Sequence, residues 1–597
     1  MRYYEEFENL FGAMDSPPSK QFKETLYNNQ LATANLASIL PDQKCRSTNF
    51  ITKHSTKVTT GAYLIKKKDD PDTLMYHEAM ADIDRQEWLK AMATEIQQLE
   101  EMNCWDVIKR SEAKGRVIPS TWTFRRKRYP DGRMKKCKAR FCVRGDQQLE
   151  GVDVFDTFAP VVSTSTIRLM LVMSLAYNLH AWCMDFTNAF VHAKREKGDE
   201  AYIELPKGFE TSNDGDYILR LKRALYGDRS APKRFYDCLK EAYLKRGFVQ
   251  SKVDPCLFLR HDAMILCWVD DQVIIVPNKA TIKPLLDDLS KDFALTDEGS
   301  LENYLGINFL RRNDGTFEAT QKGLIDKILS TMGLEDAKPS STPALLVPLG
   351  ADLHGKRFQE NYSYATVVGM CQYLQMHSRP DITYAVSQCA RFTHEPKESH
   401  GRALKKIARY LKGTKNNGLI YRPSGELSLD CYCDADFCGL WGVEDPHEPI
   451  SVRSRSGYVF TLGNCPVHWV SKLQTLTTLS TMEAEYVSLS TAMRELIPMR
   501  TIVSEIRETL KLDQKFKVRA HSKVFEDNNG ALALAKSPRM TPRSKHIAIH
   551  YHFFREQVQN GSIEILPIDT TEQLADIFTK GMPENSFTTI RKLLMGW

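Results

Sequence analysis

The chain has 597 residues and a mass of 68.3 kDa, which corresponds to three or four domains at about 150 residues each. Its 42% hydrophobic content predicts several buried cores, and its net charge is only +6. Its fourteen cysteines contain no CxxC pair of the kind that binds zinc. Its most apolar window (167–186) includes Arg168 and is too polar to cross a membrane. Its N-terminus lacks a signal-peptide pattern. We therefore expect a soluble protein with free thiols in a reducing compartment and no membrane contact.

The N-terminal part of the chain changes character twice. Residues 1–75 are polar and weakly periodic, which predicts a flexible leader or inter-domain segment. Large apolar side chains then recur at helical spacing: Trp88, Met92, Ile96 and Leu99. The stretch 125–144 holds ten Lys or Arg residues against one acid. Such a run is either a solvated surface or a phosphate contact, and we favour the contact.

A short apolar run at 181–184 predicts a strand, and Asp185 stands where it ends. Five residues later, Phe190 could lie beneath the sugar of a nucleotide and exclude a 2′-hydroxyl by clash. Simple core packing of the ring is an equal alternative.

Two adjacent aspartates, Asp270 and Asp271, lie between short apolar runs in residues 264–276, which predicts a β-hairpin with both at its tip. Adjacent like charges repel and gain nothing from burial. Mg²⁺, by contrast, takes hard oxygen ligands and leaves positions for substrate phosphates. With Asp185 as a third carboxylate, the pattern predicts a two-metal polymerase site, although a surface turn would give the same local sequence.

A Pro- and Ser-rich break at 338–348 predicts a linker, and helices are predicted between 362 and 413. The last helix carries basic residues on its outer face: Arg402, Lys405, Lys406, Arg409 and Lys412. This face suits a nucleic-acid backbone, and an ordinary solvated helix surface is an equal alternative.

After residue 427, four carboxylates stand at predicted strand ends and helix starts: Asp434, Glu483, Asp527 and Asp576. Ser480 or Thr481 is a fitting N-cap for the helix that Glu483 opens. Glu485 should point to a different helix face, which indicates a structural or auxiliary role. Each acid alone fits a cap or a surface residue. Together at one sheet edge, the four would hold two Mg²⁺ ions for RNA hydrolysis.

Six blocks resemble, in order and spacing, those of copia-type LTR-retrotransposon reverse transcriptases: DFTNAFVHA, ALYGDRSAPKRFY, WVDD, YLGINFLRR, SRPDITYAVSQCARF and ARYLKGTKNNGLIY. Later blocks resemble the ribonuclease H domain of such elements: DADFCG, STMEAEY, EDNNGA, RSKHIAIHYHFFRE and LADIFTK. The resemblance begins near residue 87 and continues to the C-terminus. It implies an α/β (α+β) fold, with right-hand polymerase fingers, palm and thumb (76–335), a linker and helical connection (336–425) and an RNase H-like α/β domain (426–597).

The resemblance also implies roles for individual residues. The catalytic and metal-binding residues would be Asp185, Asp270, Asp271, Asp434, Glu483, Asp527 and Asp576. Each active site would take two Mg²⁺ ions, with Mn²⁺ as an alternative. His546 could assist proton transfer in the second site, but we favour a packing or capping role for it.

Nucleotide contacts are implied as well. The basic stretch resembles the fingers hairpin, so Lys138 or Arg140 would grip the triphosphate, with Arg140 as first choice. The weaker candidates there are Arg125 and Lys127. Leu225 to Gly227 would form the turn that positions template and nucleotide, with Phe190 beneath the sugar. Tyr304 to Ile307 fall where the primer grip is expected.

Two departures from the family pattern stand out. Trp268 replaces the usual Tyr before VDD, and Asp228, Arg229 and Ser230 replace Leu, Lys and Gln in LYGLKQAP. These changes remove an amide that could position the nucleotide and put the negative charge of Asp228 near a phosphate path. Neither removes a metal ligand, so we expect reduced activity rather than its loss.

The predicted function is RNA-directed DNA synthesis combined with cleavage of the RNA in RNA–DNA hybrids. The implied partners are an RNA template, a DNA primer, the hybrid and dNTPs, with the integrase and capsid proteins of the same element as further partners. The implied location is a cytoplasmic retrotransposon particle, with the nucleus as an alternative. A catalytically weakened nucleic-acid-binding remnant and an RNase H-only enzyme are the rival interpretations. The absence of protease, integrase-zinc and CCHC motifs indicates a processed product or a truncated copy.

Overall fold

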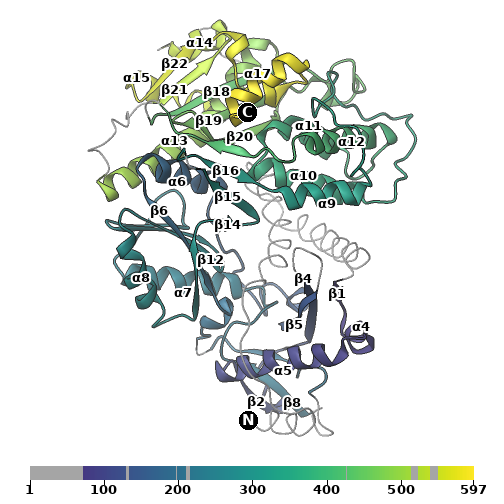
Figure 1. Ribbon diagram of the computed structural model, residues 1–597, viewed down its shortest axis with the longest axis vertical. Helices are drawn as coiled ribbons and strands as arrows, with labels where there is room; N and C mark the ends of the chain where they lie inside the picture. The colour runs from purple at the N-terminus through teal and green to yellow at the C-terminus, as the bar shows by residue number, and fades with distance from the viewer. Residues whose placement is uncertain are drawn as a thin grey trace. The chain divides into compact units, whose positions relative to one another are not determined.

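The computed structural model describes residues 72–128, 134–196, 198–209, 216–312, 314–424, 427–511, 522–537 and 549–597 (Figure 1). The predicted leader therefore lies outside the described residues as far as residue 71. The chain divides into two compact units. The first unit comprises residues 1–160 and 186–242, and the second comprises 161–185 and 243–597.

The first unit contains the basic hairpin. Helix α5 (Arg85–Glu101) packs on a sheet ordered β1 (Thr73–Leu74), β4 (Ser120–Arg128) and β5 (Met134–Val143). Trp88, Met92, Ile96 and Leu99 are buried, which confirms the predicted helix face. The antiparallel β4–β5 pair carries the run of Lys and Arg.

A second sheet of the first unit has the order β2 (Trp105–Lys109), β8 (Tyr217–Leu221), β7 (Ala201–Ile203), β3 (Val117–Ile118). Short helix α4 (Tyr76–Ala81) contacts α5. Helix α7 (Ala231–Lys245) begins in this unit, and its first two residues are the last two of the LYGDRSAP motif.

The second unit begins with a six-stranded sheet, whose order is β13 (Leu295–Ser300), β6 (His180–Phe186), β12 (Asp271–Val276), β11 (Ala263–Trp268), β10 (Leu257–Arg260), β9 (Val249–Gln250). The predicted strand at 181–184 lies within β6, and the predicted hairpin is the antiparallel β11–β12 pair. Helices α6 (Thr164–Ala176) and α8 (Ile282–Leu289) belong to the same unit.

A four-stranded sheet follows: β14 (Asn303–Tyr304), β15 (Ile307–Arg311), β16 (Phe317–Thr320), β17 (Leu419–Tyr421). Its helices are α9 (Lys322–Met332), α10 (Tyr364–His377), α11 (Thr383–Ala390) and α12 (Glu398–Gly413). On the basic face of α12, Lys405 pairs with Glu360 at 2.6 Å and Arg409 Nε donates to the Lys338 carbonyl. These protein contacts favour a structural surface, and a nucleic-acid role for α12 stays a prediction.

The C-terminal sheet is mixed. Its order is β20 (Cys465–Leu473), β19 (Arg455–Leu462), β18 (Leu429–Asp436), β21 (Ser522–Glu526), β22 (Ile563–Pro567). β18, β21 and β22 run parallel, and β18, β19 and β20 run antiparallel. The helices are α13 (Thr481–Leu510), α14 (Asn529–Lys536), α15 (Arg555–Gln559), α16 (Asp576–Thr579) and α17 (Glu584–Met595). The whole is a mixed α/β protein, and none of its described helices combines the length and hydropathy needed to cross a membrane.

Candidate active sites

The first candidate site, called the hairpin site, comprises Asp185, Asp270 and Asp271. Strand register places Asp271 directly opposite Asp185 on β6 and opposite Trp268 across the β11–β12 turn. Cross-strand partners have Cβ atoms about 5 Å apart, so the two carboxylates start from neighbouring positions. Asp270 and Asp271 are 9% and 6% exposed. The register therefore gathers the three predicted carboxylates at one end of three adjacent strands.

The tip of this hairpin has a strained backbone and is held by hydrogen bonds of buried side chains. Val269 has a φ of +54°, which is unfavourable for a β-branched residue and is typical of functional sites. The fully buried Gln272 donates from Nε2 to the Val269 carbonyl at 2.9 Å, and Tyr243 donates its hydroxyl to Gln272 Oε1 at 3.3 Å. Sequence reasoning missed Gln272, although a lone amide inside the run QVIIV was a usable signal.

Tyr304 lies near the hairpin site. Burial raises the pKa of its hydroxyl well above the usual range, and the charge of Asp271 adds to the effect. Tyr304 precedes a two-residue turn in which Leu305 and Gly306 both have positive φ, as type I′ hairpins require. The predicted primer grip is thus a tight hairpin whose turn is preceded by a buried tyrosine side chain.

In the first unit, the two predicted triphosphate contacts differ in exposure. Arg140 is 7% exposed and its guanidinium lies 4.7 Å from the centre of the Tyr226 ring, whereas Lys138 is half-buried. Glu95 of α5 is near both, and its burial raises the pKa of its carboxyl while their charges oppose that rise. Of the weaker candidates, Arg125 is the strand partner of Lys138, and the Lys127 side chain lies outside the described part of the chain.

Phe190 and Gly227 both lie in packed surroundings. The Phe190 ring is 3% exposed and makes an edge contact with Tyr226 at 5.3 Å between centroids. Gly227 has a φ of +84°, and a Cβ atom there would come within 2.2 Å of the Val143 carbonyl oxygen. Only glycine fits this approach of two backbones. A sugar contact by Phe190 stays a prediction.

Asp228 occupies a buried site that compensates its charge. The carboxylate is paired with Arg195. It also accepts hydrogen bonds from Gln148 Nε2 at 3.1 Å and from the Ser230 backbone N–H at 3.0 Å. The side chains of Arg195 and Asp228 are 5% and 1% exposed. In LYGDRSAP, the Asp228 carboxylate is therefore paired and hydrogen-bonded within a local network and is not a free negative charge.

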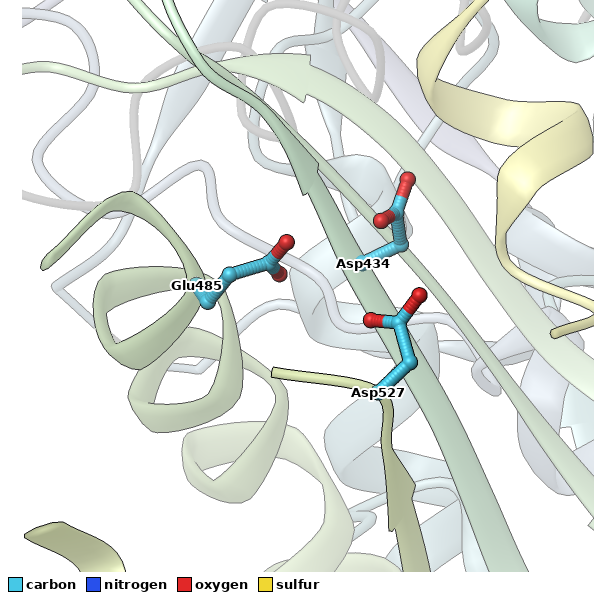
Figure 2. A group of neighbouring side chains, drawn as sticks. All are labelled: Asp434, Glu485 and Asp527. Atoms are coloured by element: carbon cyan, nitrogen blue, oxygen red, sulfur yellow. The ribbon is translucent and has the colours of Figure 1, made fainter. Parts of the chain in front are cut away.

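The second candidate site, called the C-terminal acidic site, comprises Asp434, Glu485 and Asp527. One carboxylate oxygen from each lies within 4.8 Å of the others. Figure 2 shows the three groups turned toward one another, Asp434 from β18, Glu485 from α13 and Asp527 from the end of β21. Parallel pairing of β18 and β21 brings their carboxyl ends to the same sheet edge.

This arrangement differs from the prediction at one position, because Glu485 occupies the place expected for Glu483. Glu483 lies in the first turn of α13 and accepts a hydrogen bond from the Leu479 N–H at 2.8 Å, while Ser480 caps the helix by accepting from the Glu483 N–H. Its carboxylate thus serves the helix start. Glu485, two residues on, points from α13 over the sheet edge, so its assignment to an auxiliary role does not match its position.

Asp576 lies close to the same site. Burial, followed by the charge of Asp434, raises the pKa of its carboxyl to about 7, and Lys580 Nζ lies 2.9 Å from Asp576 Oδ1. Thr579 donates its hydroxyl to Asp434, and Thr570 donates to Asp527 at 3.0 Å. His546 lies outside the described residues.

Crowding of anions shows in the pKa values of the site. Burial raises the pKa of Glu485 well above its usual range, and the charges of Glu526, Asp434 and Asp527 add to the rise. Burial and Asp434 also raise the pKa of Asp527. Closely spaced carboxylates disfavour joint ionisation unless a cation is present. Their hard oxygen donors fit Mg²⁺ or Mn²⁺.

These geometries describe a protein with two carboxylate sites on separate sheets of one unit, and comparison with known proteins identifies its class. Residues 102–346 match the model of the family described as reverse transcriptase (RNA-dependent DNA polymerase). The chain belongs to the copia-type retrotransposon Pol polyproteins and carries their reverse transcriptase region.

Two plant relatives illustrate the similarity. The retrovirus-related Pol polyprotein from transposon RE1 of Arabidopsis thaliana is 32% identical over 84% of this chain and 33% of its own length. The corresponding polyprotein from transposon TNT 1-94 of Nicotiana tabacum is 31% identical over 90% of this chain and 40% of its own length. The chain thus spans a third to two fifths of these relatives.

A solved structure of a foamy viral protease-reverse transcriptase in complex with double-stranded DNA is also similar. It has a TM-score of 0.42 and 12% sequence identity, and the match covers 94% of this chain and 84% of that chain.

Proposed function

We propose that the chain is an RNA-directed DNA polymerase with a second, hybrid-specific ribonuclease site. The observation that carries the proposal is the strand register that sets Asp185 opposite Asp271 beside Asp270. The proposed architecture is a right-hand polymerase, a helical connection and an RNase H-like domain, with the boundaries given above. Template, primer, hybrid and dNTPs are the proposed ligands.

In the polymerase reaction, Asp185, Asp270 and Asp271 would hold two Mg²⁺ ions at the end of the primer. Bound Mg²⁺ supplies activation of an attacking oxygen and charge neutralisation at the departing one, in this site and in the ribonuclease site. Gln272 and Tyr243 keep the strained tip in place, and a preorganised arrangement of this kind avoids rearrangement during the reaction. Lys138 and Arg140 are the proposed triphosphate contacts, Phe190 the proposed sugar contact and Gly227 the turn residue.

In the ribonuclease reaction, Asp434, Glu485 and Asp527 would hold the ions, and Asp576 would complete the set. The carboxyl of Asp576 has a pKa of about 7, so it can exchange a proton near neutral pH. Lys580 beside it offers a positive group for a phosphate. Thr579 and Thr570 orient Asp434 and Asp527 by the hydrogen bonds described above.

The rival interpretation of a weakened remnant rested on LYGDRSAP. The pairing of Asp228 with Arg195 counters it, because the guanidinium compensates the charge of the buried carboxylate. A buried acid–base pair loses stability when one partner is removed, so Asp228 contributes to the stability of this turn.

Primer extension on poly(rA)/oligo(dT) with Mg²⁺, run beside cleavage of a hybrid labelled in its RNA, tests the proposal. The unaltered chain should show both activities. Asp270→Asn should abolish extension and leave cleavage, and Asp434→Asn should do the reverse. The exposed Asp287 on α8 pairs with Lys283 and belongs to neither set of carboxylates, so Asp287→Asn is the matched control. Cleavage without extension would indicate an RNase H-only enzyme, and hybrid binding with neither activity would indicate a remnant.

A further inference from the structure

A small cavity in the second unit is lined by helix α6, by the four-stranded sheet of β14 to β17 and by the last turn of α10. Its volume is about 10 Å³, which is room for one water-sized particle. Most of its wall is apolar and includes Leu171 and Ile307, but Arg168, Tyr304 and His377 line it as well. Cavities that stay empty in proteins are apolar, so the three polar side chains indicate an occupant.

These polar side chains are buried and carry atoms that need partners. Arg168, Tyr304 and His377 are 5%, 4% and 3% exposed. Within the described parts of the chain, Arg168 Nε, the Tyr304 hydroxyl and both ring nitrogens of His377 have no hydrogen-bond partner. The guanidinium and the hydroxyl each offer a hydrogen, and a neutral imidazole offers one N–H. A ligand that accepts from all three would remove the cost of leaving these buried donors unpaired.

The Arg168 guanidinium is held firmly at the edge of this cavity. Its Nη1 donates to the Val467 carbonyl at 3.0 Å, and its Nη2 donates to the Met376 carbonyl. One face of the guanidinium lies 3.8 Å from the centre of the Trp469 ring. All of these partners are uncharged, so they fix the position of the guanidinium without neutralising it.

The cavity therefore carries a net positive charge. Burial lowers the pKa of Arg168 only to about 10, so its side chain is charged near pH 7. Of the described groups, only the Tyr421 hydroxyl would stabilise that charge by ionising, and burial raises its pKa far above neutral. Burial and the charge of Arg168 lower the pKa of His377 to about 3, so the imidazole is neutral. A water molecule would satisfy the donors and leave the charge, whereas an anion would do both.

Tyr304 connects the cavity to the turn after β14. Burial and the charge of Asp271 raise the pKa of its hydroxyl, which therefore stays protonated and can donate. The next residue in the turn is held from α10, because the Tyr373 hydroxyl donates to the Leu305 carbonyl. A ligand bound to Tyr304 would hold the same turn from α6.

We infer that this cavity binds one monatomic anion, chloride, which accepts hydrogen bonds from Arg168, Tyr304 and His377. Phosphate, acetate and other polyatomic anions exceed its volume. The ion neutralises the buried guanidinium and ties helix α6 to the turn after β14. The inference is independent of the proposed function, because binding of the ion requires neither polymerase nor ribonuclease activity.

Thermal unfolding of the full chain tests the inference in solution, as potassium glutamate is replaced stepwise by potassium chloride at constant ionic strength. A ligand of the folded state raises Tm with the logarithm of its concentration once that exceeds Kd, and the unaltered chain should show this rise. Tyr304→Phe removes one donor and keeps the ring, so its rise should begin at about tenfold higher chloride. Tyr384→Phe removes another buried hydroxyl that has no described partner and does not line this cavity, so it is the matched control.

Anomalous diffraction from crystals soaked in bromide, which replaces chloride, locates the ion. A bromide peak should lie in the cavity beside Arg168 Nε, and Arg168→Gln should remove it. Chloride curves that coincide for the unaltered chain and Tyr304→Phe would overturn the inference, as would a water molecule in the cavity that bromide does not replace. If Arg168→Gln does not fold, Tyr304→Phe still decides. Neither readout uses enzymatic activity, so a failure of the proposed function is distinguishable from a failure of this inference.

Discussion

Glu485→Gln and Glu483→Gln make the same chemical change two residues apart on α13, and the structure predicts opposite results for hybrid cleavage. Glu485 places a carboxylate oxygen within 4.8 Å of oxygens from Asp434 and Asp527. At that separation and an effective dielectric constant of about 20, the interaction energy of two unit charges is about 3.5 kcal/mol, which corresponds to a few hundred-fold in rate. Glu485→Gln should therefore slow Mg²⁺-dependent cleavage by about that factor.

Glu483→Gln keeps an oxygen that can accept from the Leu479 N–H, so its rate should stay within about threefold and its stability within about 1 kcal/mol. Initial rates on a labelled hybrid, measured over a range of Mg²⁺ concentrations, give the comparison. If Glu483→Gln is the slow variant and Glu485→Gln retains its rate, the assignment of the C-terminal acidic site is refuted.

Three further predictions concern stability, each measured by urea unfolding. Burial lowers the pKa of His377 to about 3, so below about pH 6.5 the imidazole is protonated in the unfolded chain and neutral in the folded one. The free energy of unfolding should therefore fall by about 1.4 kcal/mol for each pH unit below about 6.5. His377→Gln should abolish this slope. Gly227→Ala should cost more than about 2 kcal/mol, because the backbone there is left-handed and Val143 leaves no space for a Cβ atom. Gly323 has open space around it, so Gly323→Ala should be neutral or stabilising. Equal effects of the two substitutions would contradict this prediction. Asp228→Leu should cost about 3 kcal/mol, because buried Arg195 loses its buried partner and retains only the more exposed Asp199. Adding Arg195→Met should restore most of this loss, and no recovery would show that the pair is not the cause.

The elements that carry the hairpin site could be predicted because each rests on local sequence. Short, continuously apolar and buried runs define the strands around Asp270 and Asp271, and their pairing with Asp185 follows once the strands are adjacent. Gln272 was not predictable in its role, because its partners, Val269 and Tyr243, meet it only in the folded hairpin.

The position of Glu485 shows where sequence spacing stops being informative. Two acids two residues apart on a helix point about 200° apart, so only one can face a given sheet edge. Which one does so depends on the rotation of α13 over β18, and that rotation is set by buried neighbours such as Ala484 and Ser488. Ser488, for example, donates its hydroxyl to the Asp434 carbonyl at 2.9 Å.

The charge of Asp228 could not be interpreted from sequence for a similar reason. Arg195 lies 33 residues earlier in the chain, and Gln148 lies 80 residues earlier. Only the fold brings these partners to the LYGDRSAP turn and converts a departure from the family pattern into a neutral, buried pair.

The claim that two carboxylate clusters each hold divalent cations is tested most directly by anomalous diffraction. Crystals of the full chain with an RNA–DNA hybrid would be soaked in Mn²⁺ and measured at the manganese edge. The account predicts anomalous peaks beside Asp185 and Asp271 and beside Asp434, Glu485 and Asp527. Peaks confined to other acids, or none at these two places with hybrid bound, would contradict it.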